Sequence, residues 1–212
     1  MPVETDEGII LNKYSFSETS IVIHWLTYNS GLISTAARGV FKPKSKFFGK
    51  IDLFYYANIE FKKNIKSDLH SLNDIDLIST HDWIRSNILA LHQASYCATL
   101  IERLVEKDSP IPNIFNNFLT FIESLNKQNA SLISLLWFEI KLLSDFGEFP
   151  YPKEVSSNQP DYIQLLANSN SPLNFEIPNK IINDINRYIL KFLPNNERLF
   201  SIRKKATNLI QY

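Results

Sequence analysis

The sequence predicts an α+β chain, with a small barrel of five strands over residues 1–80 and an all-α domain over residues 81–212. Two observations lead to this fold class. Up to Ser79, short apolar or alternating stretches are separated by turn-forming sequences, which is typical of strands. From Thr80 onward, apolar residues recur with a period of 3.6, as they do in helices that bury one face. Five short strands of this kind are enough to close a small barrel.

The predicted strands are residues 7–13, 20–27, 32–38, 51–61 and 69–79. Residues 20–27 are apolar on both faces, so this strand should be covered on two sides. Residues 51–61 alternate, and the odd-numbered residues are expected to face the core. The opposite face then presents Phe54 and Tyr56, which burial of the first face does not explain. These two aromatic residues could stack on bases from an open barrel face or pack against the helical half.

The predicted helices follow apolar stripes at residues 84–105, 114–126, 132–146, 179–193 and 197–210. The third is apolar nearly all round and is expected to be a central buried helix that stops at Gly147. Glu139 and Lys141 within it then need either a buried partner or exposure at one edge. The last helix is expected to carry Arg203, Lys204 and Lys205 on or near its polar side. Residues 148–178 contain five prolines, which predicts a long irregular insertion.

The overall charge of zero indicates no particular partner, but the charges are unevenly distributed. Residues 81–184 carry seven Lys or Arg and twelve Asp or Glu, whereas residues 185–212 carry six and one. A basic C-terminal segment therefore follows an acidic middle. No apolar window reaches the roughly 18 residues of a membrane span. The acidic, polar start MPVETDEG does not resemble a secretory signal, so we expect a cytoplasmic protein.

The sequence contains none of the common nucleotide-binding or hydrolase motifs. The four histidines lie in different predicted elements, and the single cysteine, Cys97, lies in an apolar helical pattern. We therefore expect no disulfide, no metal and no other cofactor. Neighbouring carboxylates such as Asp6 and Glu7, or Asp74 and Asp76, are interpreted as solvated. The chain is predicted to be a binding protein and not an enzyme.

A basic, aromatic stretch at residues 36–50, AARGVFKPKSKFFGK, is the clearest candidate binding site. It contains five cations and three phenylalanines and no acidic residue. Pro43 prevents a regular helix, and Gly39 and Gly49 mark chain reversals. Cations neutralise phosphates and rings stack on bases, so this loop suits a single-stranded nucleic acid. The alternatives are a solvated lysine loop and, for Phe47 and Phe48, a plug at the end of the barrel.

Several segments occur in a characteristic order. The first, GIILNKYSFSETSIVIHWLTYNSGLISTAARGVFKPKS, contains these matching positions: Gly8–Leu11, Glu18, Leu26–Thr27, Gly31–Leu32 and Ala37–Arg38–Gly39. It is followed by three more: residues 94–125, WFEIKLLSDFGEFP at 137–150 and RLFSIRKK at 198–205. In this order they resemble the RecO family of bacterial DNA repair and recombination mediators.

The resemblance implies an N-terminal five-stranded OB-fold barrel followed by a helical domain. It also implies binding of single- and double-stranded DNA, annealing of complementary strands, and action together with RecR. Contact with the C-terminal tail of single-stranded DNA-binding protein, and help in loading the recombinase RecA, belong to the same expectation. Many members carry a four-cysteine zinc element after the Gly-aromatic-Pro turn. Here that place reads YPKEVSSNQPDY, so zinc is expected to be absent.

These considerations give a set of candidate residues. The expected DNA contacts are Arg38, Lys42, Lys44, Lys46, Lys50, Phe41, Tyr56, Arg198, Arg203 and Lys204. On the family analogy, the tail of single-stranded DNA-binding protein needs an apolar pocket with a nearby cation in the helical domain. Arg103 and Lys107 are the candidates for that cation. Two alternatives stay open: a protein-interaction adaptor that binds no DNA, and an OB-fold protein that binds RNA.

Overall fold

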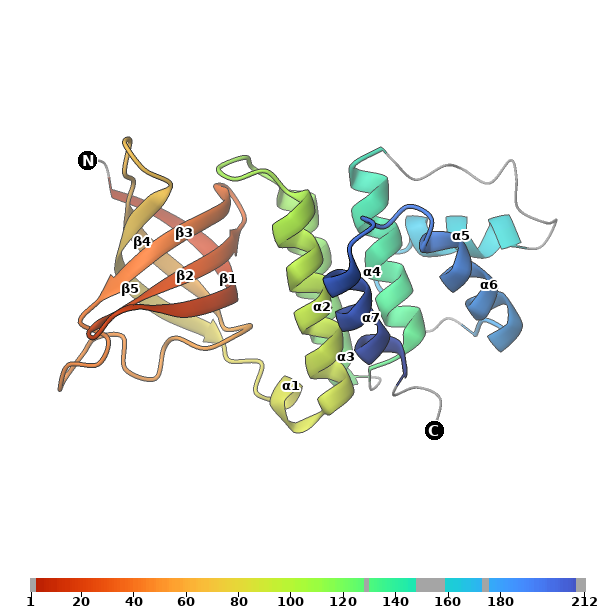
Figure 1. Cartoon of the computed structure of the whole chain (residues 1–212), viewed down its shortest axis with the longest axis horizontal. Helices are drawn as coiled ribbons and strands as arrows, with labels where there is room; N and C mark the ends of the chain where they lie inside the picture. Colours follow the sequence, from red (N-terminus) through yellow and green to blue (C-terminus); the bar gives the residue numbers. More distant parts are fainter. Residues whose placement is uncertain (1–2, 128–129, 148–158, 173–175, 209–212) are drawn as a thin grey trace. The chain divides into compact units, whose positions relative to one another are not determined.

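The computed structural model describes residues 3–127, 130–147, 159–172 and 176–208 (Figure 1). The chain divides into two compact units. The first comprises Met1–Asp82 together with Ala98–Phe115, and the second comprises Trp83–Cys97 together with Asn116–Tyr212. A stretch from the helical half of the sequence is thus part of the first unit.

The first unit contains five strands: β1 (Val3–Ser17), β2 (Ser20–Thr27), β3 (Gly31–Arg38), β4 (Tyr56–Lys62) and β5 (Leu69–Ser79). They close into a barrel in the order β1-β2-β3-β5-β4. Strands β3 and β5 pair in parallel and the other neighbours are antiparallel. This is an OB-fold barrel, and the predicted fold class is confirmed.

The fourth strand is shorter than the alternation predicted. It begins only at Tyr56, because the amide of Tyr55 donates to the carbonyl oxygen of Asp52 in a turn. Phe54 has a φ of 65°, which a strand residue does not adopt. Its side chain is 2% exposed, so of the two alternatives for Phe54 the structure excludes the open face and agrees with packing.

Part of the helical sequence is fastened to the barrel at the β2–β3 turn. The amide of Asp108 donates to the carbonyl oxygen of Leu32 at 3.0 Å, and His24 Nδ1 lies 2.6 Å from Glu102 Oε1. Gly31 has a φ of 73°, and a Cβ there would lie 1.9 Å from the carbonyl oxygen of Ser109. Only glycine fits this approach.

The second unit is helical. Its described helices are α1 (Trp83–Ser86), the first part of α2 (Ile88–Leu104), most of α3 (Pro112–Lys127), α4 (Leu132–Asp145), α5 (Gln159–Asn168), α6 (Asn179–Ile189) and α7 (Glu197–Asn208). Helix α4 packs against α5 and α6 and is buried along most of its length, as predicted. The Ser131 side chain caps its start, and Gly147, with a φ of 68°, follows its end.

The buried carboxylate of α4 has its partner on α7. Arg203 Nε donates to Glu139 Oε1 at 2.7 Å, and Arg203 Nη2 donates to Glu139 Oε2 at 2.8 Å. The hydroxyl of Tyr96 also donates to Glu139, and Arg203 Nη2 donates to Asn186 Oδ1. Desolvation lowers the pKa of Arg203, but the Glu139 carboxylate outweighs it and raises that pKa overall. The ion pair links α4 to α7.

The buried thiol of Cys97 makes stability depend on alkaline pH. Burial, and then the charge of Glu139, raises the pKa of Cys97 well above its ordinary value. The thiolate forms more easily in the unfolded chain, so this part of the stability is present below a pH of about 8.5 and is lost above it. We expect the free energy of unfolding to fall there by up to about 1.4 kcal/mol per pH unit. Urea unfolding from pH 7 to 9.5 measures this slope.

The matched control is Cys97→Ala, which is expected to lower stability at every pH but to remove this part of the slope. Tyrosines of the unfolded chain ionise near pH 10 and contribute little in the chosen range. A variant with the same slope as the parent chain would show that the thiol is not responsible.

Candidate nucleic-acid interface

The connection from β3 to β4 contains the basic loop, residues 38–50. It is built from successive turns, in which the amides of Lys42, Ser45 and Phe48 donate to carbonyl oxygens three residues earlier. The amide of Val40 also donates to the carbonyl oxygen of Thr19, which ties the loop to the β1–β2 hairpin. The loop therefore has a defined backbone at one end of the barrel.

Four of the five predicted cations of the loop point into solvent. Arg38, Lys42, Lys44 and Lys46 are all exposed. Within the described part of the chain, none of the four has a carboxylate within ion-pair distance. Their positive charge is uncompensated locally, which favours binding of a polyanion.

The fifth cation, Lys50, is half-buried and differs from the others. Its Nζ donates to the carbonyl oxygen of Ile75 at 2.5 Å. We therefore expect Lys50 to hold the loop against β5 more than to contact phosphate.

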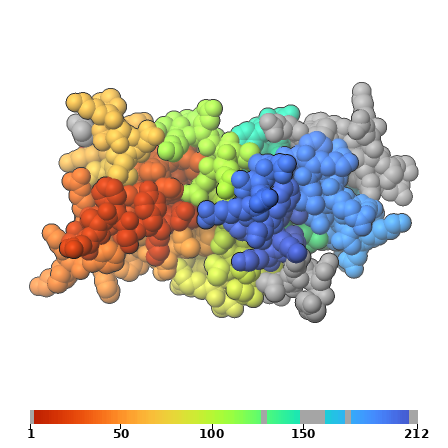
Figure 2. Space-filling view, viewed as in Figure 1, coloured from red at the N-terminus to blue at the C-terminus, as the bar shows by residue number. Residues whose placement is uncertain are grey.

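The three phenylalanines of the loop differ in burial: one is in the core and two are exposed. Phe47 is 3% exposed and belongs to the hydrophobic core of the barrel, so it plugs the barrel end. Phe41 and Phe48 are 61% and 86% exposed. In Figure 2 the orange segment that contains them projects from the edge of the barrel. The exposed rings are available to stack on bases.

A pocket of about 400 Å³ lies between the loop and the end of β1. It is lined by Lys13, Tyr14, Ser15, Ile21, Val40, Phe41, Phe47, Phe48, Gly49 and Ile51. The sequence interpretation missed Tyr14, because the first predicted strand ends at residue 13 and β1 instead continues to Ser17. The spacing of Tyr14 and Phe16, both half or more exposed, was the available signal for a strand with aromatic residues on one face.

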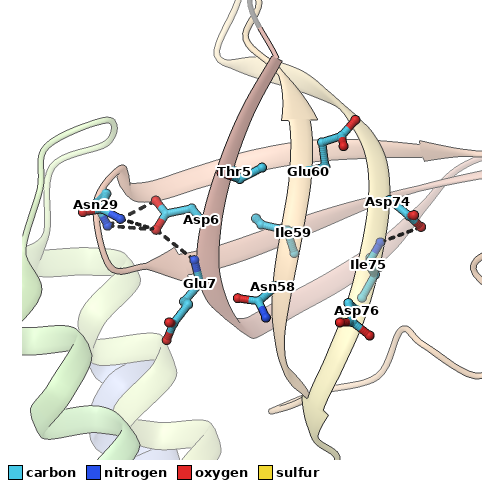
Figure 3. A pocket seen from close by; sticks show the side chains of 10 residues that line it. All are labelled: Thr5, Asp6, Glu7, Asn29, Asn58, Ile59, Glu60, Asp74, Ile75 and Asp76. Carbon is cyan, nitrogen blue, oxygen red and sulfur yellow. Dashed lines mark hydrogen bonds between the residues drawn. The ribbon is translucent and has the colours of Figure 1, made fainter.

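Acidic side chains gather on another face of the barrel, which is formed by β1, β4 and β5 (Figure 3). A pocket of about 430 Å³ there is lined by Thr5, Asp6, Glu7, Asn29, Asn58, Ile59, Glu60, Asp74, Ile75 and Asp76. Asp6 does not fit the interpretation of a solvated carboxylate. It is 6% exposed and accepts hydrogen bonds from the backbone of Asn29 and Ser30, which fixes the β2–β3 turn. A phosphate backbone would be repelled from this face.

Tyr56 lies beside the acidic face and not among the cations. Its hydroxyl donates to Glu7, and its ring packs edge-on against Phe115 with centroids 6.0 Å apart. These contacts account for the half-buried side chain through packing. They favour packing as the role of Tyr56, and a DNA contact by this residue stays a prediction.

Comparisons with known proteins agree with the barrel and the helices that follow it. The family model described as "Recombination protein O N terminal" matches residues 1–81, and "Recombination protein O C terminal" matches residues 85–154. The chain belongs to the RecO family. Among its relatives are proteins named DNA repair protein RecO from Geobacter sulfurreducens and Bacillus subtilis. They are 25% identical over 141 residues and 28% identical over 144 residues.

These matches cover 66% and 68% of this RecO-family chain but only 57% and 56% of the two relatives. A third relative with the same name, from Idiomarina loihiensis, is 26% identical over 140 residues, which is 59% of its length. The aligned part therefore spans little more than half of each relative.

The second basic surface of this RecO-family chain is on α6 and α7. Arg198, Lys204 and Lys205 are exposed, and so is Arg187, which lies 3.7 Å from Asp184. Arg203 is the exception, because it is 4% exposed and its guanidinium is bound by Glu139 and Asn186. The prediction of Arg203 as a phosphate contact is therefore wrong, and its role is structural.

The two cations considered for partner binding, Arg103 and Lys107, are both exposed on the segment that belongs to the barrel unit. Lys107 lines a pocket of about 260 Å³ together with Trp25, Leu32 and Ile33, and it pairs with Asp68 at 3.3 Å. Arg103 does not line this pocket. Of the two, Lys107 is thus the one beside apolar side chains.

The expectations about metal binding and membrane spans can be compared with the described residues alone. In the described residues, no group of three or more His, Cys, Asp or Glu side chains is placed to hold a metal ion. The YPKEVSSNQPDY stretch, where the resemblance implies the place of a zinc element, lies largely outside those residues. No helix of the described part is both long and apolar enough to cross a membrane.

Proposed function

We propose that this chain acts in recombinational DNA repair by binding single-stranded DNA on the basic loop. A second strand would bind the exposed cations on α6, on α7 and in the turn after α6: Arg187, Lys191, Arg198, Lys204 and Lys205. Neutralising both phosphate backbones reduces their mutual repulsion, so that complementary bases can pair. The protein would thus anneal strands by charge compensation, without a chemical step.

One observation carries the proposal. Arg38, Lys42, Lys44 and Lys46 are exposed within nine consecutive residues, and no carboxylate in the described structure neutralises them. Four phosphate contacts of this kind predict a log–log salt slope of roughly −2.8 for a single strand, from about −0.7 per contact. The exposed aromatic rings beside them favour a strand whose bases are unpaired.

The partners proposed for this chain follow from its family and rest on less structural detail. They are double-stranded DNA, RecR, the C-terminal tail of single-stranded DNA-binding protein and, indirectly, RecA, all in the bacterial cytoplasm. The pocket beside Lys107 offers Trp25, Leu32 and Ile33 to an aromatic end and Lys107 to an acidic tail, although Glu102 also lines it.

The test is the rate of annealing of two complementary oligonucleotides across a salt series. We expect acceleration at about 0.05 M salt and little at 0.5 M, because counterions then screen and compete for the phosphates. An RNA oligonucleotide of the same sequence separates the RNA-binding alternative. Annealing rates that do not respond to the protein at any salt concentration would contradict the proposal.

A further inference from the structure

The pocket between the basic loop and the end of β1 has an apolar floor that belongs to the barrel core. Phe47 is 3% exposed and Ile21 is 8% exposed, and both are members of the core cluster of the barrel. Because these side chains are held in place by the core, the floor of the pocket exists before a ligand binds. The pocket is thus largely preformed, as small-ligand sites usually are.

The walls of this pocket are aromatic and unusually exposed. Phe41, Phe48 and Tyr14 line it and are 61%, 86% and 50% exposed. Exposed aromatic side chains that surround a pocket are typical of an interaction site. A flat aromatic ligand would bury these rings.

The rim of the pocket is positive. Lys42, Lys44 and Lys46 lie on the stretch that joins two lining segments, 40–41 and 47–49, and all three are exposed. Lys13 lines the pocket directly and pairs with Asp52 at 2.7 Å. None of the lining residues is acidic. An aromatic hollow with cations around it is complementary to a planar group that carries negative charges on both sides.

We infer that the pocket captures one unpaired nucleobase of a single strand, while the phosphates on either side bind the lysines of the rim. This inference rests on the proposed DNA-binding function and adds the place where the protein holds one base of the strand. A base inside an intact duplex cannot enter without being unpaired and unstacked, which costs a few kcal/mol. The pocket therefore gives the basic loop a preference for single strands that charge alone does not supply.

The test compares the affinity for an oligonucleotide with the affinity for a deoxyribose phosphate chain of equal length that carries no bases. We expect the parent protein to bind the base-bearing strand about 5- to 150-fold more tightly, as expected for stacking of one base. The variant Phe41→Ala/Phe48→Ala should lose most of this preference and keep its affinity for the abasic chain and its salt slope. Quenching of 2-aminopurine fluorescence in the strand reports the stacking directly.

The matched control is Phe16→Ala, which removes a ring of 60% exposure from the same strand end without altering the pocket lining. It should leave the preference unchanged, and Phe48→Trp should retain it. Equal binding of both chains by the parent protein, or a preference that survives in Phe41→Ala/Phe48→Ala, would overturn the inference while leaving charge-driven binding intact. Binding of neither chain at low salt would overturn the proposed function as well.

Discussion

Replacing Arg38, Lys42, Lys44 and Lys46 together by alanine is expected to weaken binding of single-stranded DNA by about 100- to 600-fold at 0.1 M salt. Each phosphate contact releases counterions and so favours binding by a factor equal to the molar salt concentration raised to the power of about −0.7. Each lost contact removes this factor. The log–log salt slope should become less steep by about 2.8. Fluorescence anisotropy with a labelled oligonucleotide, repeated at several salt concentrations, measures both quantities.

Two control variants test whether position or only total charge matters. Lys62, Lys63 and Lys66 lie at the opposite end of β4 from the loop, near Glu60 and Asp74 of the acidic face. Changing these three to alanine is expected to affect the slope much less, because they lie away from the loop and beside an acidic face that repels a phosphate backbone. Lys50→Ala should leave the slope nearly unchanged, since its ammonium is bound by the carbonyl oxygen of Ile75.

An equal loss of affinity in the quadruple variant and in the Lys62, Lys63 and Lys66 control would contradict a localised interface. It would indicate that the strand responds to the overall charge of the barrel.

The strands and most helices follow from the sequence because apolar periodicity reports burial directly. The period of two before Ser79 and of 3.6 after Thr80 predicts the fold class, which the barrel order confirms. Apolar periodicity does not predict the burial of residues at which the backbone leaves a regular conformation. Phe54 continues the alternation of its neighbours in the sequence, yet a turn at Asp52 and a positive φ send its ring into the core. Alternation alone cannot detect a residue where the strand has not yet begun.

The exposed cations of the loop could be predicted because four of them stand close together without an acid between them. Arg203 could not be recognised from such counting, although two signals were present. It follows Leu199 by four residues and precedes Ala206 by three, so it lies on their buried face of α7. Glu139, on a helix that is apolar nearly all round, required a buried cation from elsewhere. Pairing these two facts needs the tertiary structure, because 64 residues separate the partners.

Replacing Arg203 by alanine is expected to lower the free energy of unfolding by about 3–5 kcal/mol, because Glu139 loses its cation while its side chain stays fully buried. Urea or thermal unfolding measures the loss, and DNA binding should fall only in proportion to the unfolded fraction. The double variant Glu139→Gln/Arg203→Met should recover much of the stability, since it removes both buried charges together.

Lys204→Ala provides the matched control, because its side chain is exposed on the next position of the same helix. It is expected to change the stability by no more than about 0.5 kcal/mol and to weaken DNA binding through the second basic surface. The opposite pattern, with Arg203→Ala folded normally but defective in binding, would return Arg203 to the interface. The two neighbours thus separate a cation that holds the helical unit together from one that is available to phosphate.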